Sequence, residues 1–233
     1  MRNRGFEFNG INSDSLGLII TKREIYKAPA RNQKLVSIPG RTGDAVDDEG
    51  TYPNVTIEYE VGSKKISSVF DNMADWLCVP GYHKLIDSRD MSYYRKAVCV
   101  SGENWEEEIK NFGRTKITFS CVAYRFLTAG QDVITLTKPS IIINDLKYPS
   151  EPHIKIFGSG DITLMINNIT YPVKGVNGFI EIDSEELEVY KGDESFNDKA
   201  NFKEFPALIN GENRISWTGS VSKVEITPNW RRL

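Results

Sequence analysis

One stretch of this chain has clearly helical spacing, and almost everything else reads as strand. Between Ser63 and Gly81, apolar residues recur at intervals of three and four, which places them on one face of a helix. These residues are Ile66, Val69, Phe70, Met73, Trp76 and Leu77. Ser63 is a candidate N-cap, and Pro80-Gly81 is a candidate stop. Such a helix needs an apolar surface to lie on, so the sequence predicts a helix covering a sheet.

Charge and hydropathy narrow the classes of function. The net charge, counted as the number of Lys and Arg residues minus the number of Asp and Glu residues, is 18 − 17 = +1 for residues 1–130. For residues 131–233 it is 11 − 15 = −4. Neither half has the basic excess that binding to a nucleic-acid backbone requires. No apolar run approaches the length of a membrane span, and no signal-peptide core follows Met1. We therefore expect neither membrane insertion nor classical secretion.

Motifs for catalysis or cofactor binding are sparse. Cys78, Cys99 and Cys121 form no CxxC pair, and only His83 and His153 could assist them, so we predict buried structural thiols in a reducing cytoplasm. The chain has no GxSxG elbow and no GxxxxGK loop. We predict no metal site, no cofactor and no catalytic residues.

The first half reads as an α+β domain, with an antiparallel sheet and one covering helix. Apolar and polar residues alternate from Val55 to Val61 and again from Ile117 to Cys121, which indicates strands with one buried face. Segments 83–86 and 93–100 read as a further strand pair. Residues 39–53, bounded by glycine and proline, are predicted to form an exposed loop.

Past Phe126 the helical periodicity disappears, and short strand candidates follow one another closely. They are 133–136, 141–143, 154–157, 162–166, 170–173, 179–182, 187–190, 214–217 and 221–226. Gly158-Ser-Gly160, Asn167-Asn168 and Asn177-Gly178 supply turn residues between them. The pattern predicts a C-terminal β-sandwich of jelly-roll type over residues 129–233, after an N-terminal domain of residues 1–128.

Two sugar-related functions remain open for the second half. Asp183, Glu185, Glu186 and Glu188 are clustered acids, but turn acids are usually only solvated, which makes a glycosidase the weaker alternative. A carbohydrate-binding module needs an exposed aromatic ring. Trp217 alternates with Ile215 and is predicted to be in the core, whereas Trp230 is the better candidate for exposure.

Several spaced features together resemble one family, the distal tail proteins of long-tailed, non-contractile bacteriophages. In the first half the resemblance rests on Ile38-Pro39-Gly40-Arg41-Thr42-Gly43, Ala74-Asp75-Trp76-Leu77, Gly81, Leu85, Tyr93-Tyr94, Ala97 and Phe119-Ser-Cys121. In the second half it rests on Ile180-Glu-Ile182-Asp183-Ser184, Val189-Tyr190, Phe205-Pro206-Ala207-Leu208, Gly211-Glu-Asn213, Trp217-Thr-Gly219 and Ile226-Thr-Pro228-Asn-Trp230-Arg231. The chain departs from the family pattern after Cys121, where a proline is usual.

The resemblance implies a structural component of a phage or prophage tail tip rather than an enzyme. It implies an N-terminal domain that assembles into a homo-hexameric ring and a galectin- or carbohydrate-module-like C-terminal sandwich. The ring would join the tail tube protein to the tail-tip hub and receptor-binding proteins, with DNA only as cargo through its channel. The protein would be made and assembled in the cytoplasm of the host bacterium. The alternative is an adhesion module that binds host wall polysaccharide through Trp230.

Ring closure requires one surface patch to meet a different patch on a neighbouring copy, and unpaired sheet edges supply such surfaces. We predict that the loop 39–53 and the strand 55–61 contribute to this contact. The candidate interface residues are Pro39, Gly40, Arg41, Gly43, Val55, Ile57 and Tyr59. A channel for DNA is expected to be neutral or acidic, which makes Asp44, Asp47, Asp48 and Glu49 candidate lining residues.

Overall fold

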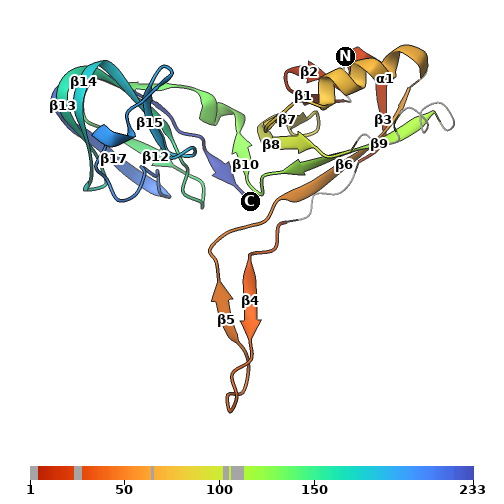
Figure 1. The fold of residues 1–233 in the computed structure, drawn as a ribbon, viewed down its shortest axis with the longest axis horizontal. Coiled ribbons are helices and arrows are strands. Elements are labelled where there is room, and N and C mark those ends of the chain that lie inside the picture. Colours follow the sequence, from red (N-terminus) through yellow and green to blue (C-terminus); the bar gives the residue numbers. More distant parts are fainter. Residues whose placement is uncertain (1–4, 24–27, 64–65, 102–104, 106–112) are drawn as a thin grey trace. The chain divides into compact units, whose positions relative to one another are not determined.

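The structure is a computed structural model that describes residues 5–23, 28–63, 66–101, 105 and 113–233 (Figure 1). It contains two compact units of similar size. Unit 1 comprises residues 1–125 with Leu233, and unit 2 comprises residues 126–232. The division therefore falls three residues before the boundary at residue 128 that the sequence suggested. The chain is mainly β, as predicted, with one large antiparallel sheet in each unit and a separate two-stranded sheet in unit 1.

Unit 1 is built on a sheet whose strands follow the order β2-β1-β7-β8-β9-β6-β3. The bounds are β1 (Phe6–Phe8), β2 (Ile11–Asn12), β3 (Leu18–Arg23), β6 (Val55–Ser63), β7 (His83–Asp87), β8 (Tyr93–Cys99) and β9 (Arg114–Cys121), with a 3-10 turn η1 (Ser13–Leu16). The longest pairing joins β6 to β9, with Val55 opposite Cys121 and Gly62 opposite Arg114. The two strands with the clearest alternation in the sequence are thus neighbours in the sheet.

The predicted helix is α1 (Ile66–Leu77), which follows β6 directly. Met73, Trp76 and Leu77 are buried as expected, whereas the side chains of Ile66, Val69 and Phe70 lie outside the described part of the structure. Ser63 is not the N-cap. It is the last residue of β6, and its backbone N–H donates to the Gly113 carbonyl oxygen at 3.2 Å. No helix in the described ranges is long and apolar enough to cross a membrane.

Aromatic rings fill the core beneath this helix. The Phe6 ring stacks on Tyr59 with centroids 4.4 Å apart and on Trp76 at 5.4 Å, and Phe8 lies 5.0 Å from Phe119. The Trp76 indole N–H also donates to the Phe8 carbonyl oxygen at 2.7 Å. Because buried aromatic pairs add to the free energy gained from area burial, this cluster holds the helix on the sheet.

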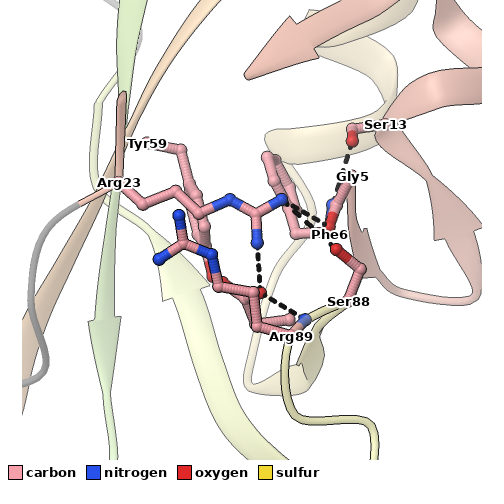
Figure 2. Close-up of polar contacts among 8 residues, drawn as sticks. Gly5, Phe6, Ser13, Arg23, Tyr59, Ser88 and Arg89 are labelled. Atoms are coloured by element: carbon pink, nitrogen blue, oxygen red, sulfur yellow. Dashed lines mark hydrogen bonds and ion pairs between the residues drawn. The ribbon is translucent and has the colours of Figure 1, made fainter. Parts of the chain in front are cut away.

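A partly buried ion pair joins two strands that are separated by three others in the sheet order (Figure 2). The guanidinium of Arg23, at the end of β3, pairs with the Asp87 carboxylate at the end of β7, and it also donates to Ser88 Oγ at 3.2 Å and to the Gly5 carbonyl at 3.3 Å. Asp87 accepts a further hydrogen bond from the Tyr59 hydroxyl at 3.1 Å. Since β8, β9 and β6 lie between β7 and β3 in the order, these contacts show that the sheet curls.

Unit 2 wraps one antiparallel sheet, in the order β11-β17-β13-β14-β15-β16, around a single apolar core, with β12 also paired to β17. The bounds are β11 (Ile134–Leu136), β12 (Ser140–Asn144), β13 (His153–Ile166), β14 (Ile169–Asp183), β15 (Glu188–Lys191), β16 (Glu194–Ser195) and β17 (Gly211–Thr227). The remaining short elements are β10 (Arg125–Leu127), η2 (Thr128–Gln131), η3 (Asn197–Lys199) and β18 (Arg231–Arg232).

Three pairs of predicted strands are single long strands in the structure. Segments 154–157 and 162–166 are both in β13, 170–173 and 179–182 are both in β14, and 214–217 and 221–226 are both in β17. The glycines between them mark bends rather than turns: Gly158 lies opposite Gly178, and a Cβ on Gly158 would lie 2.2 Å from the Ser220 carbonyl oxygen. Because glycine has no side chain, the backbones of neighbouring strands approach closely at Gly158, and the strands can bend there around the core.

The three cysteines differ in exposure. Cys121 is buried, and burial raises the pKa of its thiol to about 12; Cys99 is half-buried, and burial raises the pKa of its thiol as well. Cys78 is exposed. The sequence-based prediction that all three thiols are buried is therefore wrong for Cys78, which follows the last residue of the helix.

We expect Cys78 to be the fastest of the three thiols to react with iodoacetamide at pH 8, because it alone among them is exposed. Cys121 should remain unmodified in the folded protein and become reactive in denaturant. Peptide mass spectrometry after timed labelling measures both. Rapid modification of Cys121 in the native protein would contradict the packing of β9.

Replacing Arg23 with Ala should lower the free energy of unfolding of unit 1 by about 2 to 4 kcal/mol, because it leaves the partly buried Asp87 without its cation. Arg31→Ala, which removes an exposed ion pair, should cost less than about 1 kcal/mol. Urea unfolding with hydrogen exchange read separately for each unit measures both. If both substitutions lowered the free energy of unfolding by the same small amount, the Arg23–Asp87 pair would not stabilise unit 1 as proposed.

Candidate assembly surface

Residues 33–48 form a β-hairpin that is hydrogen-bonded to no other strand of the described chain (Figure 1). Its strands are β4 (Gln33–Val36) and β5 (Ala45–Asp48), with Leu35 opposite Val46 and Val36 opposite Ala45. The sequence analysis assigned β5 to an exposed loop of residues 39–53. That assignment is wrong because β5 pairs in register, although its acidic sequence lacks an apolar alternation.

Both faces of the hairpin carry exposed aliphatic side chains. Leu35 and Val46 share one face and are 69% and 59% exposed, Val36 on the other face is 46% exposed, and Ile38 beyond β4 is 42% exposed. An isolated two-stranded hairpin is marginally stable in water, and clustered exposed apolar residues mark interaction surfaces. The hairpin therefore has the composition of an element that another surface covers.

An ion-paired clasp joins the two legs of the hairpin at its base. Arg31 Nε lies 2.8 Å and 2.6 Å from the two Asp48 carboxylate oxygens, and the Arg31 guanidinium lies over the Tyr52 ring at 5.5 Å. The hydrogen bond from Arg31, with those from the Gly50 N–H and Gln33, lowers the pKa of Asp48 to about 2. The clasp holds the hairpin closed in the absence of any partner.

The predicted interface residues fall into two groups. Pro39, Gly40, Arg41 and Gly43 lie in the exposed tip, where Gly40 and Gly43 have φ values of +82° and +84° that favour glycine. Val55, Ile57 and Tyr59 lie on β6.

On β6, Val55 and Ile57 are half-buried, while Tyr59 is only 3% exposed within the core of unit 1. β9 pairs with β6 along its length, and β3 pairs with residues 59–63, so among the described residues one edge of β6 has no partner near Val55 and Ile57. The Tyr59 side chain is therefore not part of the candidate surface.

The predicted channel-lining acids all lie on the second leg of the hairpin and are exposed. Asp48 is paired with Arg31, and Glu49 is paired with Lys34 at 3.2 Å. Asp44 and Asp47 form no ion pair within the described residues. The hairpin thus presents two carboxylates that form no ion pair with a described cation, although Lys34 lies opposite Asp47 in the strand register.

A half-open cavity of about 340 Å³ lies in unit 1 beside β6, β7 and β8. Its lining is rich in arginine and tyrosine: Thr56, Ile57, Tyr59, Leu85, Asp87, Arg89, Asp90, Tyr93, Tyr94, Arg95 and Arg125. Arg95 is 6% exposed and donates from Nη1 to the Ala123 carbonyl oxygen at 3.1 Å. The sequence analysis missed this cavity, because its arginines are far apart in the chain and match no motif.

The predicted sugar-binding groups in unit 2 do not form a binding platform. Trp230 is half-buried rather than exposed and packs against the core, as Trp217 does. Asp183 Oδ1 accepts hydrogen bonds from the backbone N–H groups of Glu185 and Glu186 at 3.0 and 3.1 Å, so it orders its own turn. The described residues contain no cluster of three or more His, Cys, Asp or Glu that could hold a metal ion.

The clasp should persist at pH 4 and be lost as the pH falls through about 2, because the pKa of Asp48 is lowered from 3.8 to about 2 by its partner. Following the Asp48 carboxyl resonance by NMR during an acid titration measures this midpoint. In an Arg31→Gln variant the midpoint should move up toward 3.8. An unchanged midpoint in that variant would show that Arg31 is not the cause.

No family model matches the sequence, and no curated protein matches it. The fold does match a solved structure, described as the crystal structure of the Dit protein (gp 19.1) of phage SPP1, a paradigm of the hub of the adsorption apparatus in phages infecting Gram-positive bacteria. The match has a TM-score of 0.69 at 11% sequence identity and covers 98% of this chain and 99% of the SPP1 chain. This chain therefore has the fold of the SPP1 distal tail protein through both of its units.

Proposed function

We propose that this protein is a distal tail protein that forms a sixfold ring at the tip of a phage tail. The observation that carries the proposal is the fold match, which extends over 98% of this chain and 99% of the SPP1 protein without a large insertion in either. Because fold alone does not fix function, the proposal also needs a surface suited to assembly. The β4–β5 hairpin supplies it.

The hairpin is suited to a contact between unlike surfaces of neighbouring copies. Leu35 and Val36 point to opposite faces of a ribbon only two strands wide, and both are exposed. A ring built from one repeated contact covers such a ribbon with the next copy, and closure follows when the rotation between copies is complete. We assign Pro39, Gly40, Arg41 and Gly43 in the tip, with Val55 and Ile57 at the unpaired edge of β6, to this contact.

The charge of the hairpin is compatible with DNA passage through the ring. Within residues 31–52, four acids (Asp44, Asp47, Asp48 and Glu49) and three cations (Arg31, Lys34 and Arg41) give 3 − 4 = −1. A lining without excess positive charge does not retain phosphates. We propose that wherever the hairpin approaches the DNA path, it presents these acids.

In this role the ring joins the tail tube protein to the tail-tip hub and receptor-binding proteins, and it is assembled into the virion in the host bacterial cytoplasm. The proposed function is structural, and it depends on surfaces that bind other proteins. We do not carry the glycan-binding alternative further, since the half-buried Trp230 ring gives it no stacking platform.

The full chain, purified and analysed by native mass spectrometry, should show a species of six subunits whose population rises with protein concentration. The proposal is contradicted if the protein stays monomeric from micromolar to near-millimolar concentration in low and physiological salt. It is equally contradicted by a closed ring in which residues 33–48 remain as accessible to hydrogen exchange as in the monomer.

A Leu35→Ser, Val46→Ser double variant should raise the concentration needed for half-assembly by at least about tenfold, because burying each side chain contributes roughly 1.5 to 3 kcal/mol. Ile141→Ser in unit 2 removes a similarly exposed aliphatic side chain, 52% exposed, and should leave assembly unchanged. Arg41→Glu tests the tip in the same assay. Unchanged assembly in the double variant and in Arg41→Glu would remove the hairpin from the interface.

A further inference from the structure

We propose that the arginine- and tyrosine-lined cavity of unit 1 is the receiving site for the hairpin of a neighbouring copy, and that it binds the carboxylates of Asp44 and Asp47. This inference rests on the proposed ring and names the surface that the hairpin meets. The occupant is thus a second copy of this chain, presenting an acidic β-ribbon.

The charge around the cavity favours an acidic occupant. Arg89, Arg95 and Arg125 line it together with Asp87 and Asp90. Asp87 is paired with Arg23, which does not line the cavity itself, and Asp90 is paired with Arg125 at 3.3 Å. Four arginines and two aspartates give 4 − 2 = +2 for this group, against −1 for the hairpin.

Arg89 is the arginine best placed to meet an incoming carboxylate. Its backbone N–H donates to Asp87 Oδ1 at 2.9 Å (Figure 2), which fixes the turn after β7. Arg89 itself is exposed. Among the described residues its guanidinium makes no ion pair. Arginine binds carboxylates with two parallel hydrogen bonds, so the site has both the charge and the geometry for Asp44 or Asp47.

The remaining walls of the cavity suit the apolar part of the hairpin. Ile57, Leu85 and Tyr94 line the cavity together with Tyr93, whose ring is stacked beneath the Arg125 guanidinium at 4.9 Å. A cavity of about 340 Å³ admits a few side chains, not a whole ribbon. Val36 and Ala45 lie opposite each other on the face of the hairpin that also carries Asp47, so these aliphatic side chains have an apolar surface to cover.

In this structure the hairpin of the same copy does not occupy the cavity. Thr56 and Ile57 line the cavity, whereas no residue of the hairpin does. Asp44 precedes Thr56 by twelve residues, so an extended connection spans at most roughly 40 Å. Each molecule therefore carries a receiving site at one end of this segment and an acidic tip at the other. Two such different surfaces allow head-to-tail association of copies.

The experiment uses two charge-reversed full-length variants. The hairpin variant carries Asp44→Lys and Asp47→Lys, and the cavity variant carries Arg89→Glu. Each alone should require at least about tenfold more protein than the wild type for half-assembly, because each places like charges at every contact. The matched controls are Asp193→Lys and Lys138→Glu, which reverse exposed charges in unit 2 and should assemble as the wild type does.

Mixing the two variants in equal amounts gives the decisive result. Alternating copies pair a reversed hairpin with a reversed cavity, and a native hairpin with a native cavity, so native mass spectrometry should show mixed rings with equal numbers of each variant. Circular dichroism should show that each variant is folded on its own.

Two results would overturn the inference. If Arg89→Glu assembles as the wild type does, or if the mixture assembles no better than its components, the cavity does not receive the hairpin, and the proposed ring is unaffected. If the wild type forms no ring at any concentration, the proposed function fails and this inference fails with it.

Discussion

The contact between Arg23 and Asp87 is the interaction on which the shape of unit 1 depends. Sheet order alone places β3 and β7 on either side of three other strands, yet the guanidinium of one reaches the carboxylate of the other. The same carboxylate orders the turn that carries Arg89 and accepts the hydroxyl of Tyr59 in the aromatic core. The partly buried Asp87 carboxylate therefore contacts residues of three features: the curled sheet, the aromatic core under the helix and one wall of the cavity.

The hairpin has the opposite character. Its strands pair only with each other, its aliphatic side chains are exposed on both faces, and an exposed ion pair closes its base. The sheet of unit 1 buries an aromatic core under the helix, whereas the hairpin has no buried side chain. This contrast is the physical reason for the proposal that a neighbouring copy covers the hairpin.

Local periodicity predicted the parts of the fold that depend on local patterns. Met73, Trp76 and Leu77 were recognisable from helical spacing, and β6 and β9 from alternation. Strand β5 was missed because Ala45–Asp48 has no apolar alternation, and its pairing comes from the turn and from β4.

The long strands of unit 2 were divided because a glycine at a bend has the same sequence signature as a glycine at a turn. The Arg23–Asp87 pair and the arginine-lined cavity left no local signal at all, since their residues meet only after the sheet has curled.

Single-particle electron microscopy of the purified full chain tests the central claim most directly. The account predicts closed rings of six copies in which each β4–β5 hairpin is covered by the neighbouring subunit and its tip lies against that subunit's β7 and β8. Particles the size of a single chain at all accessible concentrations, or rings in which every hairpin projects uncovered into solvent, would contradict it.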